Sequence, residues 1–229
     1  MPRWERPVAL VTGARRGIGA ALLHRLAGRG PVIGTARLPL PAGGPAHWLP
    51  LDVTDPESFT ALKRTLDGQP AGLVVCNAGI YPDKGQNLAD GFPAEMWAET
   101  LATNVTGVFL TVQAMLPSLR AAVAEGETAK IAVLSSQMGS SERAPGGSYI
   151  YRASKAAATN LARNLAADLA GLGIAVGAYH PGWVRTDMGG AEAAISVDEA
   201  ADGLIARFDE LAVGTTGRFQ TWDGRAHPF

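Results

Sequence analysis

The stretch "PVALVTGARRGIGAALLHRLAGRG" (residues 7–30) joins a short apolar run to a longer one through a glycine-rich turn. Residues 7–13 are typical of a buried strand, and residues 18–30 carry apolar side chains at helical spacing before closing glycines. Gly13, Gly17 and Gly19 let the backbone approach a diphosphate, which the helix N-terminus attracts with free N–H groups and its dipole. The stretch therefore predicts a dinucleotide-binding βα unit, with a ligand-free strand-to-helix turn as the alternative.

The rest of the chain repeats this alternation of strand and helix. Further strands are expected at 31–37, 47–53, 71–79, 129–136, 174–182 and 217–224, and helices at 55–66, 93–126, 151–173 and 196–211. Asp55 and Ser196 are expected as N-caps, and Pro117 is expected to bend the third helix. The pattern predicts an α/β fold: a single Rossmann-type, doubly wound domain over residues 1–229, with a seven-stranded, mostly parallel sheet flanked by helices on both faces.

Composition excludes several classes of protein. Lys and Arg total 20 against 21 Asp and Glu, so the net charge of −1 argues against nucleic-acid binding. The single cysteine, Cys76, forbids an internal disulfide, and the four histidines lack metal-ligand spacing, so no metal site is expected. We read no signal peptide in "MPRWERPVAL" (1–10) and no apolar run long enough to span a bilayer. A cytoplasmic protein that acts on a small molecule is the expectation.

The end of the second strand bears on the choice of cofactor. An acidic residue there would favour NAD(H), but "GTARL" (34–38) offers Ala36 and Arg37 instead. Arg37, with Arg16 of the glycine loop, could clamp a ribose 2′-phosphate, since guanidinium matches phosphate geometry. NADP(H) is therefore favoured over NAD(H). The alternatives are that Arg37 is merely solvated, or that the enzyme prefers NAD(H).

Six pieces in order give the chain its resemblance to a known family. They are "TGARRGIG" (12–19), "LDV" (51–53), "NAG" (77–79), "NVTG" (104–107), "SS" (135–136) followed by Tyr151-x-x-x-Lys155, and "PGWVRTDM" (181–188). Together they resemble the short-chain dehydrogenase/reductase family, and the wording around residues 135–190 looks like its C-factor and sniffer-like carbonyl reductase branch.

The resemblance implies roles for individual residues. The catalytic set would be Ser136, Tyr151, Lys155 and Asn104, with Asn104 holding a water of the proton relay. The cofactor-binding set would be Gly13, Arg15, Arg16, Gly17, Ile18, Gly19, Arg37, Asp52, Val53, Asn77, Ala78, Gly79, Tyr151, Lys155, Pro181, Gly182, Val184 and Thr186. In the same reading Asp52 would accept from the adenine amino group, and Lys155 would bind the nicotinamide ribose and lower the pKa of Tyr151.

Elementary chemistry supports the catalytic assignment. Carbonyl reduction needs a proton for the developing alkoxide, and Tyr151 shares a helix face with Lys155, four residues on. Tyr149, six residues before the lysine, would face away and precede the helix. Ser136 can bind the substrate oxygen, whereas Ser135 would point to the other side of its strand. The expected function is NADP(H)-dependent carbonyl reduction or alcohol oxidation; a non-catalytic dinucleotide sensor or signalling protein is the alternative.

The chain departs from the family pattern in two loops, and its two long helices bear on its oligomeric state. The helix usually found between the second and third strands is reduced to the Pro/Gly loop 38–46, and the segment 187–195 is short, which favours an open substrate pocket. The helices 93–126 and 151–173 carry apolar residues on more than one face. A homodimer or homotetramer is therefore expected.

Overall fold

The structure is a computed structural model that describes residues 4–229; the first three residues, which the predicted domain includes, lie outside the described residues. Its strands form one sheet in the order β3-β2-β1-β4-β5-β6-β7, and every pair of neighbouring strands is parallel. The strands are β1 (Val8–Val11), β2 (Val32–Ala36), β3 (His47–Pro50), β4 (Ala71–Cys76), β5 (Ala129–Leu134), β6 (Ile174–His180) and β7 (Phe219–Thr221). The predicted fold class, a seven-stranded doubly wound sheet, is confirmed.

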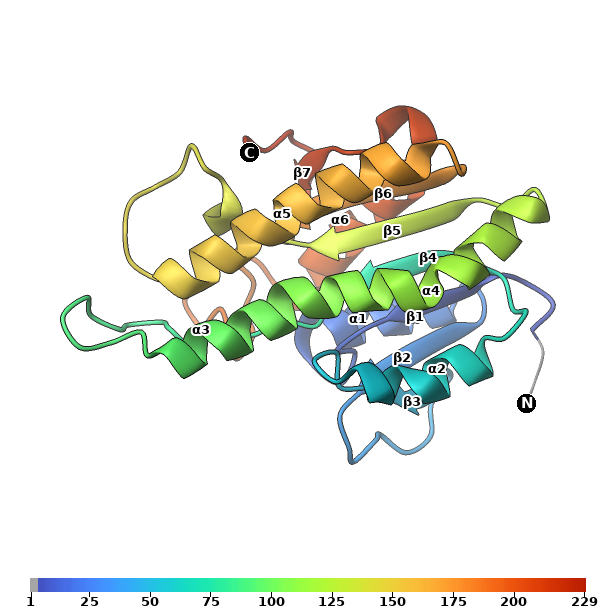
Figure 1. Ribbon diagram of the computed structural model, residues 1–229, viewed down its shortest axis with the longest axis horizontal. Helices are drawn as coiled ribbons and strands as arrows, with labels where there is room; N and C mark the ends of the chain where they lie inside the picture. The colour runs from blue at the N-terminus through green and yellow to red at the C-terminus, as the bar shows by residue number, and fades with distance from the viewer. Residues whose placement is uncertain (1–3) are drawn as a thin grey trace.

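Helices cover both faces of this sheet (Figure 1). One face carries α2 (Phe59–Thr65), α4 (Gly107–Ala124) and α5 (Tyr149–Ala170); the other carries α1 (Gly17–Ala27) and α6 (Val197–Glu210). The core divides in the same way, because successive side chains of a strand point to opposite faces. Leu10 of β1 belongs to the cluster under α4 and α5, and Val11 belongs to the cluster under α1 and α6.

The sequence determines several helix ends directly. The Asp55 side chain accepts from the backbone of Glu57 at the start of the short 3₁₀ turn Pro56–Ser58, which leads into α2. Ser196 and Glu199 form the expected capping box of α6. Residues 38–46 form no helix, as predicted, so β2 and β3 are joined by a loop alone.

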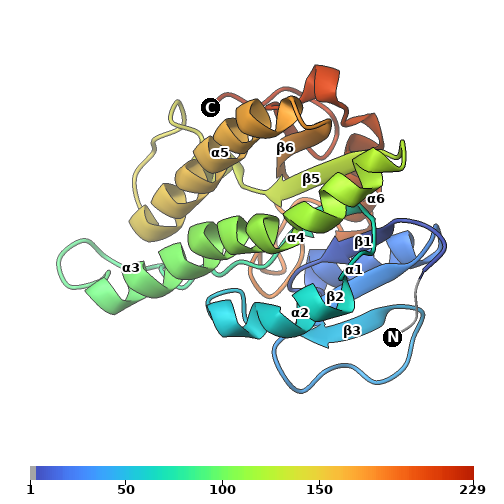
Figure 2. The same ribbon diagram turned by 45° about the vertical axis from the view of Figure 1, so that its right-hand side comes forward.

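Two helix predictions need correction. The expected helix 93–126 is α3 (Ala94–Leu101), a π-helical turn (Ala102–Thr106) and α4, which follow one another in one run (Figure 2). Pro117 lies inside α4, and the bend expected there stays a prediction. Helix α5 begins at Tyr149 rather than Tyr151, so Tyr149 belongs to the first turn after all.

The run Ala94–Ala124 also bears on the membrane expectation. By length and composition alone it is apolar enough to cross a bilayer, with a mean hydropathy of 1.4. The expectation that no run is long enough was therefore wrong. Half of the most apolar window of this run is buried inside the protein, which is typical of a core helix.

Candidate active site

The candidate site lies at the carboxyl ends of the central strands. The sheet order changes direction between β1 and β4, and ligands of open α/β sheets bind beside that switch point. Three segments of the predicted site follow strands that meet there: the glycine loop follows β1, "NAG" follows β4 and the serine pair follows β5. The topology thus brings together segments that are far apart in the chain, such as those of Gly13 and Ser136, 123 residues apart.

The glycine loop between β1 and α1 is shaped for close approach. Gly13 and Gly17 have φ of +64° and +55°, which side chains other than glycine rarely adopt. A Cβ at Gly13 would lie 2.9 Å from the Cα of Ala78, and one at Gly19 would collide with the Asn77 amide. The Asn77 side chain in turn donates to the carbonyl oxygens of Thr12 (2.9 Å) and Gly13 (3.1 Å). The predicted residues of these two loops therefore form one interlocked cradle.

Thr12 belongs to this cradle, although it was absent from the predicted set. Its hydroxyl accepts from the backbone N–H groups of Asn77 (3.0 Å) and Ala78 (3.1 Å). Its only sequence signal is its place directly before Gly13 in "TGARRGIG". Thr12 ties the loop after β1 to the loop after β4.

The start of α1 fits the diphosphate of a dinucleotide. No acidic residue lies in its first turn, and its N-cap residue, Arg16, makes no side-chain cap. The first N–H groups of the helix thus keep their capacity for an anion, which the helix dipole also favours. Ile18, also in the predicted set, packs on the core under α1 and holds this end of the helix against the sheet.

The expected adenosine side contains Arg37, Asp52 and Val53. Asp52 accepts from the backbone (2.9 Å) and hydroxyl (2.7 Å) of Thr54 through one carboxylate oxygen. These hydrogen bonds lower the pKa of Asp52, and the positive charge of Arg37 adds to the lowering. Arg37 is exposed, and Val53 is buried against the start of α4 at Gly107. Arg37 is thus near enough to Asp52 to stabilise its negative charge.

The Arg16 side chain, predicted to clamp a 2′-phosphate with Arg37, has an acidic partner in the structure. Its guanidinium pairs with the Asp187 carboxylate across the mouth of the site, and both side chains are mostly exposed. Exposed pairs of this kind contribute little to stability, so the Arg16 side chain is free to exchange Asp187 for a phosphate.

The serine pair after β5 divides as the strand period predicts. Ser135 turns into the protein and contacts the Thr159 hydroxyl at 2.6 Å and the Lys155 carbonyl at 3.1 Å. Ser136 instead caps the short turn Gln137–Gly139 by accepting from the Met138 N–H at 3.1 Å. Ser136 is therefore the serine that is available to the site.

Tyr151 is buried and adjoins Ser136. Burial raises the pKa of the Tyr151 phenol well above its ordinary value of 10, and a side-chain hydrogen bond with Ser136 only partly offsets this. The expected lowering of this pKa by Lys155 is therefore not observed: Ser136 is the group that lowers it, and burial raises it more. At neutral pH Tyr151 holds its proton, which is the form needed to protonate an alkoxide.

Lys155 lies on the same helix face, as its spacing predicts. Its ammonium nitrogen is 5.7 Å from the centroid of the Tyr151 ring and donates to the Leu134 carbonyl at 2.8 Å. Burial lowers the pKa of Lys155 from 10.5 to about 8. The side chain thus remains mostly charged at neutral pH and provides the positive charge beside the tyrosine.

Asn104 lies behind this pair in the π-helical turn. Its amide exchanges two hydrogen bonds with the backbone of Ile80 and donates to Ser154 of α5. A Cβ at Gly79 would lie 3.2 Å from the Asn104 oxygen and 3.4 Å from the Lys155 nitrogen. Asn104, Gly79 and Lys155 therefore meet at one point, and π turns of this kind are frequent at functional sites.

The segment after β6 borders the cradle and covers Tyr151. Thr186 lies beside the glycine loop, because a Cβ at Gly17 would approach its methyl group at 3.4 Å. Pro181, Gly182 and Val184 lead into it, and Val184 bridges to Ile195 so that 185–194 forms a closed loop. Its Met188 sulfur lies 4.0 Å from the Tyr151 hydroxyl. The short segment thus places Met188 beside Tyr151, a contact that the sequence does not indicate. The open substrate pocket stays a prediction.

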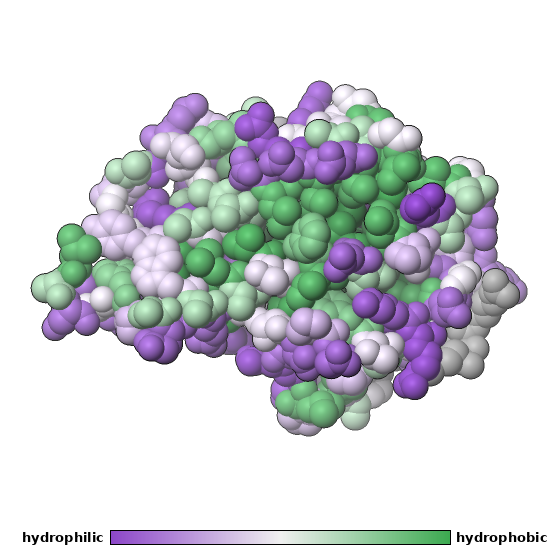
Figure 3. Space-filling model, viewed as in Figure 1, coloured by the Kyte–Doolittle hydropathy of each residue, from purple (hydrophilic) through white to green (hydrophobic). Residues whose placement is uncertain are grey.

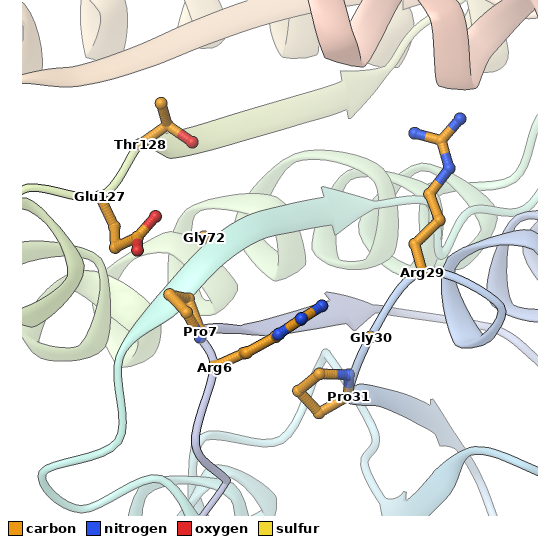
Figure 4. Close-up of a pocket in the computed structure, with 8 residues that line it drawn as sticks. All are labelled: Arg6, Pro7, Arg29, Gly30, Pro31, Gly72, Glu127 and Thr128. Atoms are coloured by element: carbon orange, nitrogen blue, oxygen red, sulfur yellow. The ribbon is translucent and has the colours of Figure 1, made fainter.

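Other candidate sites are less suitable. Within residues 4–229 no group of three His, Cys, Asp or Glu side chains could hold a metal ion. A pocket of about 390 Å³ lies at the opposite, amino-terminal edge of the sheet (Figure 4). It is lined by Arg6, Pro7, Arg29, Gly30, Pro31, Gly72, Glu127 and Thr128. It lies at the end of the sheet where ligands of this architecture do not bind, and Arg29 is already paired with Asp209.

Comparison of the sequence with known proteins gives consistent matches. The profile of the short chain dehydrogenase family matches residues 7–195. C-signal from Myxococcus xanthus is 35% identical over 161 residues, which are 70% of this chain and 93% of that protein. The 1-hydroxy-2-glutathionyl-2-methyl-3-butene dehydrogenase of Rhodococcus sp. strain AD45 is 34% identical over 227 residues, with 94% and 96% covered.

Solved structures resemble the whole chain. The NADPH-bound carbonyl reductase from chicken fatty liver has a TM-score of 0.88 at 32% identity and covers 100% of both chains. The carbonyl reductase Sniffer of D. melanogaster has a TM-score of 0.88 at 26% identity, with 97% of this chain and 99% of that chain covered. The 3-ketoacyl-(acyl-carrier-protein) reductase of Brucella melitensis, complexed with NADH, has a TM-score of 0.83 at 25% identity and covers 95% and 96%. Similar structures therefore bind nicotinamide cofactors of both kinds.

Proposed function

This chain belongs to the short-chain dehydrogenase family, and from that premise we propose that it is an NADP(H)-dependent carbonyl reductase or alcohol dehydrogenase. The observation that carries the proposal is the buried cluster of Ser136, Tyr151 and Lys155 beside the glycine cradle. A general acid, a cation and a hydroxyl that binds oxygen are the protein groups that this reaction requires. Tyr151 and Lys155 stand on α5, and Ser136 follows the end of β5 as the cap of the turn Gln137–Gly139.

Each of these residues has a role in the proposed reaction. The bound nicotinamide dinucleotide supplies or accepts the hydride. Ser136 binds the carbonyl oxygen and orients it toward the Tyr151 hydroxyl, which donates its proton as negative charge develops on that oxygen. Lys155 keeps a positive charge near the phenolate that remains. Asn104, which meets Lys155 at Gly79, holds the water that returns a proton.

The preference for NADP(H) rests on the end of β2. Arg37 is exposed there, and no Asp or Glu stands at the end of this strand. A ribose 2′-phosphate would therefore find a cation to bind, whereas a 2′-hydroxyl would find no carboxylate acceptor. The NADPH-bound carbonyl reductase supports this choice, and the NADH-bound relative keeps NAD(H) as the alternative.

A non-catalytic signalling protein is the second candidate function. It is favoured by one observation, the similarity to C-signal over 161 residues. A protein of that kind needs no buried Tyr151 and Lys155 pair, because holding a lysine and a phenol in an apolar interior is costly. The intact pair therefore favours the enzyme.

A turnover assay separates these proposals. Purified protein is mixed with NADPH or NADH and a panel of aldehydes, ketones and quinones, and the loss of reduced cofactor is followed by absorbance. We expect turnover with at least one class of carbonyl and a higher kcat/KM for NADPH. Cofactor binding without turnover across the whole panel would favour the signalling protein, and a higher kcat/KM for NADH would overturn the cofactor preference.

A further inference from the structure

We propose that Asp83, on the loop between β4 and α3 (residues 77–93), is a positioning residue that fixes Tyr151 by capping the helix on which Tyr151 stands. The proposal rests on the function proposed above for Tyr151. Asp83 lies 68 residues before Tyr151 in the chain and has no place in the motifs that the sequence displays.

The cap itself is formed by one oxygen of the Asp83 carboxylate. It accepts from the backbone N–H of Ile150 at 2.8 Å and from that of Tyr151 at 3.3 Å. These two residues occupy the second and third positions of α5, where an N-cap side chain normally binds. Asp83 is completely buried, so water does not compete for these donors. The backbone of Tyr151 is thus bonded directly to Asp83.

Helix α5 has no cap of its own. Ser148 occupies the N-cap position, but its backbone is left-handed, with φ of +47°, and its side chain makes no cap. The Ser148 hydroxyl instead contacts the Tyr81 hydroxyl at 2.5 Å. The start of the catalytic helix therefore depends on the β4–α3 loop for its hydrogen bonds.

The same loop also holds the Tyr151 ring. Tyr81 stacks on Tyr151, with ring centroids 4.1 Å apart and planes inclined by 22°. Gly79 of the same loop adjoins Asn104 and Lys155. Asp83 therefore holds the backbone of Tyr151, and Tyr81, two residues earlier in the same loop, holds its ring. Together they limit both the position and the rotation of the Tyr151 side chain.

The charge of Asp83 adds an electrostatic effect. The second carboxylate oxygen has no hydrogen-bond partner within residues 4–229. Around Tyr151 stand Lys155 and Ser136, together with Tyr81 and Asp83 of the loop. The negative charge of Asp83 raises the pKa of Tyr151, since it disfavours the phenolate. Asp83 therefore also helps Tyr151 keep its proton until the alkoxide forms.

Two substitutions separate the cap from the charge. Asp83→Ala removes both, and we expect kcat for carbonyl reduction to fall roughly tenfold or more, because small displacements of a catalytic group are costly, while KM for NADPH stays within about twofold. Asp83→Asn keeps an oxygen that can accept the two N–H bonds, and we expect it to restore most of kcat. Because the asparagine lacks the charge, the pH profile of alcohol oxidation should shift to lower pH.

Ser196→Ala is the matched control. It removes an N-cap of the same kind from α6, on the opposite face of the sheet. It should lower the Tm as a lost cap does and leave kcat at the wild-type value. Wild-type kcat in folded Asp83→Ala, or equal loss of kcat in Asp83→Ala and Ser196→Ala, would overturn the proposal.

A titration keeps the test independent of turnover. Ultraviolet difference titration of tyrosinate, with Tyr151→Phe subtracted, reports the ionisation of Tyr151 alone. In Asp83→Asn we expect this transition at lower pH than in the wild type, and an unchanged transition would overturn the electrostatic part. If the wild type turns over no carbonyl, the proposed function fails, whereas this titration still decides whether Asp83 acts on Tyr151. If Asp83→Ala does not fold, kcat and titration of Asp83→Asn decide the matter.

Discussion

Lys155 shows, at the scale of a single residue, that this site is maintained at a cost in stability. Burial lowers the pKa of Lys155 from 10.5 to about 8, so folding disfavours its charged form. Between these pH values the unfolded chain binds a proton that the folded chain does not, and stability from this group rises with pH across that window. Below about pH 8 the full penalty, on the order of 3 kcal/mol, is present.

Comparison with Lys155→Met tests this account. The methionine fills similar space without a titrating group, so only the wild type should gain from deprotonation. We expect the free energy of unfolding of the wild type, relative to Lys155→Met, to increase from pH 8 to pH 10.5. Urea unfolding across that range measures it, and parallel curves would show that Lys155 is not the buried cation described.

Arg37 is the residue that decides the proposed cofactor preference. Arg37→Ala removes the cation that we propose binds the 2′-phosphate, and charged hydrogen bonds of this kind contribute about 1.5–3 kcal/mol. We expect kcat/KM for NADPH to fall roughly tenfold or more, with the value for NADH little changed. Arg29→Ala, at the amino-terminal edge of the sheet, is the control. An unchanged ratio in Arg37→Ala would refute the assignment.

At this scale the sequence predicted the residues that motifs mark and missed those that only folding brings close. The strand period separated Ser136 from Ser135, and the helix period paired Tyr151 with Lys155. Asp83 could not be predicted, because its partners are backbone N–H groups 67 and 68 residues away. The raised pKa of Tyr151 was missed for a related reason, since burial is a property of the folded surroundings.

At the scale of elements, Gly139 sets the separation between the Ser136 turn and α5. A Cβ at this position would lie 2.6 Å from the Lys155 carbonyl carbon and 2.9 Å from the Ala156 nitrogen, both backbone atoms that cannot move aside. Gly139→Ala should therefore push the turn away from the helix and separate Ser136 from Tyr151. We expect Gly139→Ala to lower the free energy of unfolding by about 1–3 kcal/mol, and the Tm with it. We also expect it to lower kcat.

Gly171→Ala is the control for that prediction. Gly171 ends the same helix with a right-handed backbone, and a Cβ there would meet nothing within 4 Å. Its Tm and kcat should equal those of the wild type. If Gly139→Ala keeps wild-type kcat, the close packing at Lys155 does not position Ser136.

The elements themselves were largely predictable, with one informative exception. Periodicity and caps located all seven strands and the capped start of α6. The π turn Ala102–Thr106 was missed because its residues are all compatible with an α-helix, and no glycine or proline marks it. The position of the π turn depends instead on tertiary contacts, because the Asn104 side chain hydrogen-bonds to Ile80 and Ser154.

At the scale of the whole molecule, α4 and α5 present an apolar face. Figure 3 shows apolar residues spread over the surface along these helices. Phe109 is 44% exposed there, and Leu110, Leu161 and Leu165 are only partly buried. Exposed apolar surface of this extent is typical of contacts between subunits.

We therefore expect a homodimer or homotetramer formed through α4 and α5. Sedimentation velocity at micromolar concentration should give a mass of at least two chains, and Phe109→Asp with Leu161→Asp should reduce it to that of one chain. Leu172→Asp, at an exposed position just beyond the end of α5, should leave the wild-type mass unchanged. A monomeric wild type would contradict the expectation.

We propose Tyr151 as the proton donor of an NADPH-dependent carbonyl reductase, and Tyr151→Phe removes that proton. The variant keeps the ring that stacks on Tyr81 and loses only the hydroxyl. The measurement is kcat for the best carbonyl of the panel with saturating NADPH, alongside NADPH affinity by fluorescence titration. A fall in kcat of about 10²- to 10⁴-fold with unchanged NADPH affinity is the predicted result. Retention of wild-type kcat in Tyr151→Phe would contradict it.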